Sequence, residues 1–187
     1  MPSSRPVRID KARRLLRTGV PGPGGVWADL GCGDGIFSAA LYPLIQPGGV
    51  LYAVDRSRRA LRALERALAR ELPGAELRPL RADFTRPLAL PPLDGLLMAN
   101  SLHFVRQKEP LLARLSGLLK PGGRLIVVEY NTRQGNPWVP YPLDASGFLQ
   151  LARAAGLRQA RILTTIPSTF LGEMYSGLAL GAQLPEG

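Results

Sequence analysis

Short apolar runs alternate with longer stretches of helical periodicity along most of the chain. Each run is rich in Val, Leu or Ile and is bounded by Gly, Pro or Asp, a pattern typical of β-strands. Strands that alternate with helices in this way predict βαβ crossovers, hence a doubly wound α/β fold with a mostly parallel sheet and helices on both faces. The five strands predicted from these runs cover residues 26–30, 50–54, 77–81, 93–99 and 124–129.

Two of the helices are predicted with defined ends. In "SRRALRALERALARELPG", leucines at i, i+3, i+7 and i+11 form an apolar stripe, Ser57 is a suitable N-cap, and a Pro-Gly pair ends the helix. In "EPLLARLSGLLKPGG", Pro110 suits the first turn and the leucine stripe continues to Leu118. Lys120 then follows, where we expect it to interact with the C-terminal end of the helix dipole.

The remaining segments complete the pattern. "DKARRLLRT" predicts a leading helix and "SGFLQLARAAG" a late helix, and two strand-like runs follow, "RQARILTTI" and "EMYSGLALG". No internal repeat, low-complexity region or linker interrupts the series. We therefore expect one domain over residues 1–187.

One segment does not fit regular structure. Residues 131–143, "NTRQGNPWVPYPL", contain three prolines together with Trp138 and Tyr141. The segment follows the fifth predicted strand, so it should lie over the carboxyl edge of the sheet, where open parallel sheets bind ligands. Two interpretations stay open, a packed structural cover and a wall of a substrate pocket.

Composition limits the class of protein. The apolar content of 45% and charged content of 20% are ordinary for a folded soluble domain. Cys32 is the single cysteine, which excludes an intramolecular disulfide and a multi-cysteine metal cluster, and we expect no metal site. No signal peptide is recognisable and no apolar run approaches the ~18 residues of a membrane span. We therefore expect a cytoplasmic protein.

The net charge of +10 raises nucleic acid as a partner. Only Lys11, Lys108 and Lys120 are lysines among the 24 basic residues, and arginine occurs throughout with Leu, Ala, Gly and Pro. This indicates a general compositional bias. We favour solvated helix faces over a nucleic-acid interface.

A glycine-rich loop follows the first predicted strand in "VWADLGCGDG". Gly31, Gly33 and Gly35 allow a tight turn and the close approach of a ligand. The spacing is one residue short of the dinucleotide fingerprint G-x-G-x-x-G. Asp29 precedes the glycines and Asp34 lies among them; these acids would repel a pyrophosphate but favour an ammonium or sulfonium group. The pattern indicates an adenosine that carries a cationic amino-acid tail.

Acids also follow the next two strands. Asp55, in "VLYAVDRS", is placed to accept hydrogen bonds from both hydroxyls of a ribose. Asp83 and Phe84, in "RADFTRPL", suit the exocyclic amine and the face of an adenine. Isolated structural roles are the alternative: Asp29 could cap the following helix and Asp83 could form a turn. We read Cys32 as a small loop residue, not a nucleophile.

The series "VWADLGCGDG", "LYAVDRS", "RADFTRPL", "LDGLLMANSLHF" and "LKPGGRLIVVEY" resembles the class I S-adenosylmethionine-dependent methyltransferases, and is most similar to small ones related to quinone-biosynthesis methyltransferases. The resemblance implies a Rossmann-like seven-stranded sheet whose last strand is antiparallel. It also implies S-adenosyl-L-methionine as the cofactor. The cofactor-binding residues that it implies are Asp29, Gly31, Cys32, Gly33 and Gly35 for the methionine moiety, Asp55 for the ribose, Arg56, Asp83 and Phe84 for the adenine, and Asn100 near the methyl group.

The methyl acceptor is less defined, because direct displacement at a sulfonium needs mainly positioning and a dry pocket. His103 could be a general base or a substrate contact, or it could cap a helix or pack the loop. The other candidate acceptor contacts are Glu129, Tyr130, Trp138 and Tyr141. The aromatic rings of Trp138 and Tyr141 favour a small or lipid-like organic acceptor.

Several acceptors and functions are disfavoured or remain as alternatives. The chain reads "NSLHF" where amino-adenine and amino-cytosine methyltransferases carry Asn/Asp-Pro-Pro-aromatic. It also lacks the second cysteine that a cytosine C5 methyltransferase would need as its nucleophile. Where RNA ribose 2'-O methyltransferases need a lysine, it reads "VVEYN". The alternatives are an RNA or protein methyltransferase that docks through an arginine-rich face, and a non-catalytic module that binds S-adenosylmethionine. A dinucleotide enzyme has the wrong glycine spacing.

Overall fold

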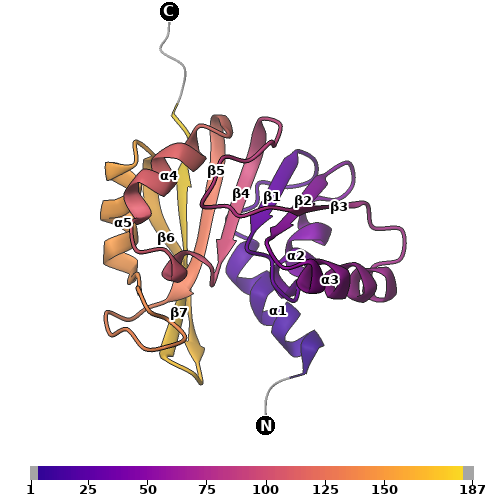
Figure 1. Cartoon of the computed structure of the whole chain (residues 1–187), viewed down its shortest axis with the longest axis horizontal. Helices are drawn as coiled ribbons and strands as arrows, with labels where there is room; N and C mark the ends of the chain where they lie inside the picture. Colours follow the sequence, from indigo (N-terminus) through magenta and orange to yellow (C-terminus); the bar gives the residue numbers. More distant parts are fainter. Residues whose placement is uncertain (1–3, 183–187) are drawn as a thin grey trace, which may run out of the picture.

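Seven strands form one mixed sheet in the order β3-β2-β1-β4-β5-β7-β6, from β3 on the right of Figure 1 to β7 and β6 on the left. The computed structural model describes residues 4–182. The strands β1 to β5 pair in parallel, whereas β7 is antiparallel to both β5 and β6, which confirms the expected sheet. The strands are β1 (Val26–Leu30), β2 (Val50–Asp55), β3 (Leu77–Arg81), β4 (Leu93–Ala99), β5 (Leu119–Tyr130), β6 (Arg158–Ser168) and β7 (Gly172–Leu180).

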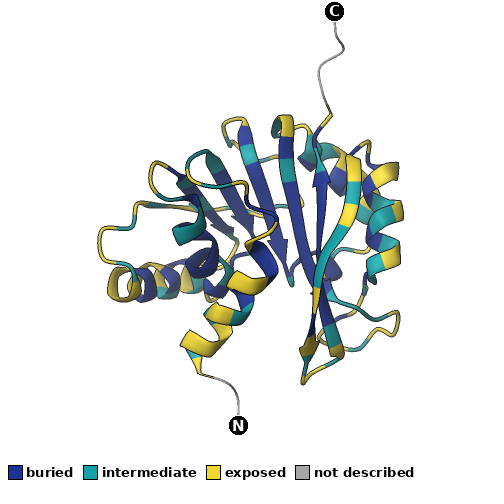
Figure 2. Cartoon of the chain, turned by 180° about the vertical axis from the view of Figure 1, so that it is seen from behind, coloured by how far each residue is buried: buried dark blue, intermediate teal, exposed yellow. Residues whose placement is uncertain are grey.

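Helices cover both faces of this sheet, because its central strands are apolar on both sides. Along β4, Leu96 and Met98 pack with α4 and α5, whereas Leu97 packs with α1 and α2 on the opposite face. The helix α3 lies on the α1 side, against Ala53 of β2. Figure 2 shows the central strands buried and the outer helix faces exposed. The helices are α1 (Arg5–Leu16), α2 (Ile36–Leu41), η1 (Tyr42–Ile45), α3 (Arg58–Glu71), η2 (Leu102–Phe104), α4 (Lys108–Ser116) and α5 (Ala145–Ala154).

The junction between α4 and β5 differs from the sequence-based prediction. The helix ends at Ser116, and β5 already begins at Leu119, which pairs with Leu93 of β4. Lys120 therefore lies on the strand, where its Nζ donates to Oδ2 of Asp94 at 2.7 Å. The prediction that Lys120 interacts with the helix dipole was wrong, because pairing with β4 draws this segment into the sheet.

Gly95 of β4 allows the ring of Trp27 to pack against the strand. A Cβ on Gly95 would lie 2.2 Å from two ring carbons of Trp27, which is itself fully buried in β1. We expect Gly95→Ala to lower the free energy of unfolding by about 1–3 kcal/mol, because the ring has no space to retreat. Urea denaturation measures the change. Gly117→Ala, at the exposed end of α4, should stay within about 0.5 kcal/mol of wild type, and an equal effect of the two substitutions would contradict this packing.

Candidate active site

The glycine loop after β1 follows a path that side chains would block. Gly31, Gly33 and Gly35 have φ angles of 78°, 52° and 77°, in the left-handed region that favours glycine. A Cβ on Gly31 would lie 2.7 Å from Cβ of Ser101, and one on Gly35 would lie 2.1 Å from a leucine methyl of α3. The loop is fixed to the end of β2, because the N–H of Gly31 donates to the carbonyl of Val54 at 2.8 Å.

Asp29 is buried near the end of β1 and does not cap α2 with its side chain. Its Oδ2 accepts the hydroxyl of Ser38 at 2.6 Å. Loss of contact with water raises the pKa of Asp29 to about 7; the Ser38 hydrogen bond opposes this rise, and the negative charge of Asp55 adds to it. An ionised Asp29 is therefore costly here unless a positive charge lies nearby.

The raised pKa makes the stability of the free protein depend on pH through Asp29. The folded state binds a proton that the unfolded state has released, so the stability falls as the pH rises from the unfolded pKa of 3.8 to the folded pKa of about 7. Relative to Asp29→Asn, which cannot ionise, wild type should lose about 2 kcal/mol between pH 5 and pH 7. Denaturation of both proteins across this range measures the difference, and a constant difference would contradict the assignment.

Asp55 is held at the end of β2 by two backbone groups. Its Oδ1 accepts the N–H of Ser57 at 2.7 Å and its Oδ2 accepts the N–H of Gly33 at 3.0 Å. The side chain is half-buried, so each oxygen keeps a lone pair for a ligand. The neighbouring Arg56 is exposed.

The thiol of Cys32, in the glycine loop, is buried. Loss of contact with water raises its pKa, and nearby acids raise it further. A raised pKa makes Cys32 a poor nucleophile.

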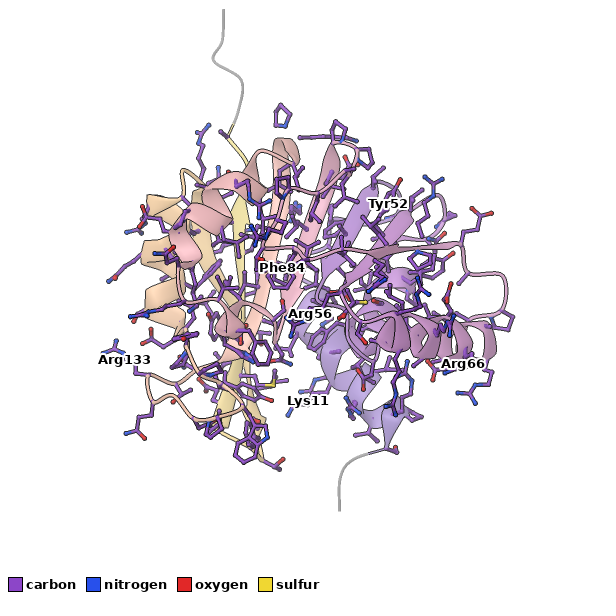
Figure 3. All side chains as sticks on the ribbon, in the orientation of Figure 1. Lys11, Tyr52, Arg56, Arg66, Phe84 and Arg133 are labelled. Carbon is purple, nitrogen blue, oxygen red and sulfur yellow. The ribbon has the colours of Figure 1, made fainter. Side chains whose placement is uncertain are left out.

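Asp83 and Phe84 follow β3, as expected, and Asp83 also forms the turn considered from the sequence. Its Oδ1 accepts both the hydroxyl and the N–H of Thr85, at 2.7 and 2.9 Å, and these bonds lower its pKa. Arg114 of α4 donates to the carbonyl of Phe84 at 2.8 Å. Cε1 of the Phe84 ring lies 3.3 Å from the position of a Cβ on Gly31. The ring thus packs beside the glycine loop (Figure 3 labels Phe84).

A cavity of about 600 Å³ opens beside the glycine loop. It lies between this loop, α1 and the turn that joins β6 to β7, so it brings together segments far apart in the sequence. Three glycine-loop residues that were predicted as cofactor contacts line it, namely Gly31, Cys32 and Gly33. The lining residues are Arg8, Lys11, Ala12, Leu15, Gly31, Cys32, Gly33, Asp34, Ile36, Phe37, Ala99, Asn100, Tyr130, Ser168, Thr169, Phe170 and Met174.

A second cavity of about 340 Å³ adjoins the first and is mainly aromatic. Asn100, Tyr130 and Phe170 line both cavities. Asn100 has a φ of 52°, and its N–H donates to the carbonyl of Val128 in β5 at 2.9 Å. Its buried side-chain Oδ1 has no hydrogen-bond partner among the described residues. A buried acceptor without a partner is costly, so this oxygen is placed for a donor on a ligand. The other lining residues of the second cavity are His103, Phe104, Trp138 and Val139.

His103 and Glu129 form a buried pair at the wall of the aromatic cavity. Nδ1 of His103 lies 2.5 Å from Oε2 of Glu129, and both side chains are almost fully buried. Oε1 of Glu129 accepts the N–H groups of Leu102 and His103 at 2.9 and 3.1 Å. Glu129 lines neither cavity: its strand position turns it under η2, where it holds His103, and its contact with the acceptor stays a prediction.

The three predicted aromatic contacts lie in different environments. Tyr130 borders both cavities, and burial together with the charge of Glu129 raises its pKa, against the opposing charge of Arg8. Trp138 lines the aromatic cavity while staying 68% exposed, so the proline-rich segment forms part of a pocket wall. Tyr141 lines neither cavity; its ring lies 5.7 Å from Nζ of Lys108.

Several cavity residues escaped the sequence-based prediction. Arg8 and Lys11 come from α1, and Phe170 and Met174 come from the β6–β7 hairpin. Neither segment carries a motif, so only their apolar periodicity indicated that they pack somewhere. Within residues 4–182, no three His, Cys, Asp or Glu side chains gather to hold a metal ion, and none of the helices is long and apolar enough to span a membrane.

Comparison with known proteins places this geometry in context. Residues 28–125, just over half of the chain, match the family described as "Methyltransferase domain". An uncharacterised methyltransferase of Mycobacterium tuberculosis is 35% identical over 105 residues, which are 56% of this chain and 50% of that protein. Trans-aconitate 2-methyltransferase of Pseudomonas paraeruginosa is 34% identical over 122 residues, 63% of this chain and 40% of that protein. The chain thus spans about half the length of the curated relatives it matches.

Solved structures share the whole fold. The magnesium protoporphyrin IX methyltransferase of Synechocystis, solved with bound S-adenosylmethionine, superposes with a TM-score of 0.69 at 19% identity. The superposition covers 95% of this chain and 79% of that one. At this identity the likeness concerns the fold.

Proposed function

We propose that this chain, which belongs to the family of S-adenosylmethionine-dependent methyltransferase domains, transfers the methyl group of that cofactor to a small organic acceptor. One observation carries the proposal: the cavity at the glycine loop and the aromatic cavity meet at Asn100, Tyr130 and Phe170. A cofactor on the glycine loop and an acceptor in the aromatic cavity would therefore have their reacting atoms side by side. The two volumes lie in the range of small-molecule sites.

The residues present fit the cofactor. The free Oδ1 of Asn100 suits the ammonium of the methionine moiety, and the fixed carboxylate of Asp55 suits two ribose hydroxyls. The buried Asp29 favours a positive charge nearby, as a sulfonium provides. Asp83, Phe84 and Arg56 surround the adenine position in this proposal. When bound, S-adenosylmethionine supplies a methyl group on a positively charged sulfur, which an acceptor atom can displace directly.

His103 is the residue that we assign to proton removal from the acceptor. It lines the aromatic cavity within three residues of Asn100. In this assignment Nδ1–H of His103 donates a hydrogen bond to Oε2 of Glu129. That bond would hold the ring in the tautomer whose Nε2 is free to act as a base. We therefore assign Glu129 as a positioning residue. Tyr130 and Phe170 would exclude water and align the acceptor.

Two kinds of evidence support a small acceptor. The relative that shares 34% identity is by name a methyltransferase for trans-aconitate, a small molecule. The two cavities together are also of a size that suits a small molecule, about 600 and 340 Å³, and they lie between α1, the β6–β7 hairpin and the loop around Trp138.

Transfer of a tritiated methyl group into a fractionated bacterial extract tests the proposal. We expect label in the small-molecule fraction, because the two cavities have the volumes of small-molecule sites. Asp55→Ala should abolish the transfer, and Glu65→Ala, which removes an exposed carboxylate from α3, should not.

The same experiment separates the alternatives. Label in the RNA or protein fraction would contradict a small acceptor and would support docking through the arginine-rich surface. Cofactor binding without label in any fraction would contradict an enzyme and would indicate a binding module.

A further inference from the structure

The cavity beside the glycine loop carries more positive than negative charge. Arg8 and Lys11 both reach it from α1, and Asp34 is the only acidic side chain in its lining. Asp34 is already occupied, since its Oδ2 accepts Nη2 of Arg8 at 2.8 Å. This pair leaves the charge of Lys11 without an acidic partner among residues 4–182.

Lys11 is held at the side of the cavity away from the glycine loop. Its Nζ donates to the main-chain carbonyl of Pro167, near the end of β6. Figure 3 shows the labelled Lys11 between α1 and the start of β7. A primary ammonium carries three donors, so two remain for a ligand. Arg8, by contrast, is tied to Asp34 on the glycine-loop side.

Two further hydroxyl-bearing residues, Tyr130 and Thr169, also line this cavity, and neither hydroxyl forms a hydrogen bond within residues 4–182. Beyond Tyr130 and Phe170 the lining becomes aromatic. One end of the combined site therefore suits an anion and the other an apolar body.

We propose that the methyl acceptor is a small organic acid: its anionic group binds Lys11, its apolar body packs between Tyr130 and Phe170, and its reacting atom lies at Asn100 and His103. This inference rests on the proposed function and names the acceptor class of that same site. An anionic acceptor can accept a charge-assisted hydrogen bond from Lys11, because Asp34 is already paired with Arg8, whereas a neutral acceptor forms a weaker one.

Binding of matched charged and neutral probes tests the inference. The protein is first saturated with S-adenosylhomocysteine, and calorimetry then compares three carboxylates with their amides: 4-hydroxybenzoate, trans-cinnamate and hexanoate. At least one carboxylate should bind about tenfold tighter than its amide, as expected for a charge-assisted hydrogen bond. Lys11→Gln should abolish this preference. Arg14→Gln, which removes the same charge from an exposed position of α1, should keep it.

Three results would overturn the assignment. The first is equal binding, or no binding, of every carboxylate and its amide. The second is a preference that Lys11→Gln leaves intact. The third is a loss of affinity for S-adenosylhomocysteine in Lys11→Gln without a loss for 5'-methylthioadenosine, which lacks the carboxylate, because Lys11 would then bind the cofactor. If wild type fails to bind S-adenosylhomocysteine at all, the proposed function itself is wrong.

Discussion

Replacing His103 with glutamine is expected to lower kcat for methyl transfer by about 10²–10⁴-fold, the usual contribution of a general base. Glutamine can still donate a hydrogen bond to Glu129, so the fold around η2 should persist, but it cannot take a proton from the acceptor. The affinity for S-adenosylhomocysteine should not change, because the imidazole lines the aromatic cavity and not the one at the glycine loop.

Initial rates with the acceptor fraction, measured for wild type and variant at saturating S-adenosylmethionine, check this expectation. Glu129→Gln should lose much of the rate as well, since an amide at Nδ1 favours the wrong tautomer. Arg106→Gln, an exposed change just after η2, serves as the control. A His103→Gln enzyme with wild-type kcat would show that the pair only supports the loop.

Replacing Asp55 with alanine is expected to weaken binding of S-adenosylhomocysteine by about 100-fold, because two hydrogen bonds to a charged group are lost. The backbone groups of Gly33 and Ser57 also lose their acceptor, so the glycine loop becomes less fixed. Both effects act in the same direction on the ligand.

Calorimetric titration of Asp55→Ala against wild type measures the loss. Glu65→Ala removes a carboxylate from the neighbouring helix without touching the loop and should bind like wild type. Comparing melting temperatures of the free proteins shows whether Asp55→Ala is folded. A folded variant whose affinity stays within twofold of wild type would contradict the role of Asp55 at the ribose.

The strands were largely predictable because their signals are local. The bounds of β1, β3 and β4 agree with the apolar runs, since each run lies between residues that end a strand. The start of β5 was not predictable in this way. Leu118 continues the helical stripe of α4, and only the distant pairing of Leu119 with Leu93 decides where the strand begins.

The site was predictable where topology alone positions a residue. Asp55 and Asp83 lie at the carboxyl edge because parallel strands all end there. The direction of a side chain is a finer property: Glu129 lies at that edge but turns under η2, and Tyr141 turns toward Lys108. Lys11 could not be found, because nothing local indicates that α1 packs across the glycine loop and the β6–β7 hairpin.

The most direct test is a thermal-shift titration of the wild-type protein with S-adenosylhomocysteine and, separately, with NAD. A ligand at 100 times its Kd adds about 2.7 kcal/mol to the free energy of unfolding. For a chain of this length that corresponds to a rise in Tm of roughly 5–11 °C. We expect this rise with S-adenosylhomocysteine and none with NAD. A rise with NAD alone, or with neither ligand, would contradict a methyltransferase cofactor site at the glycine loop.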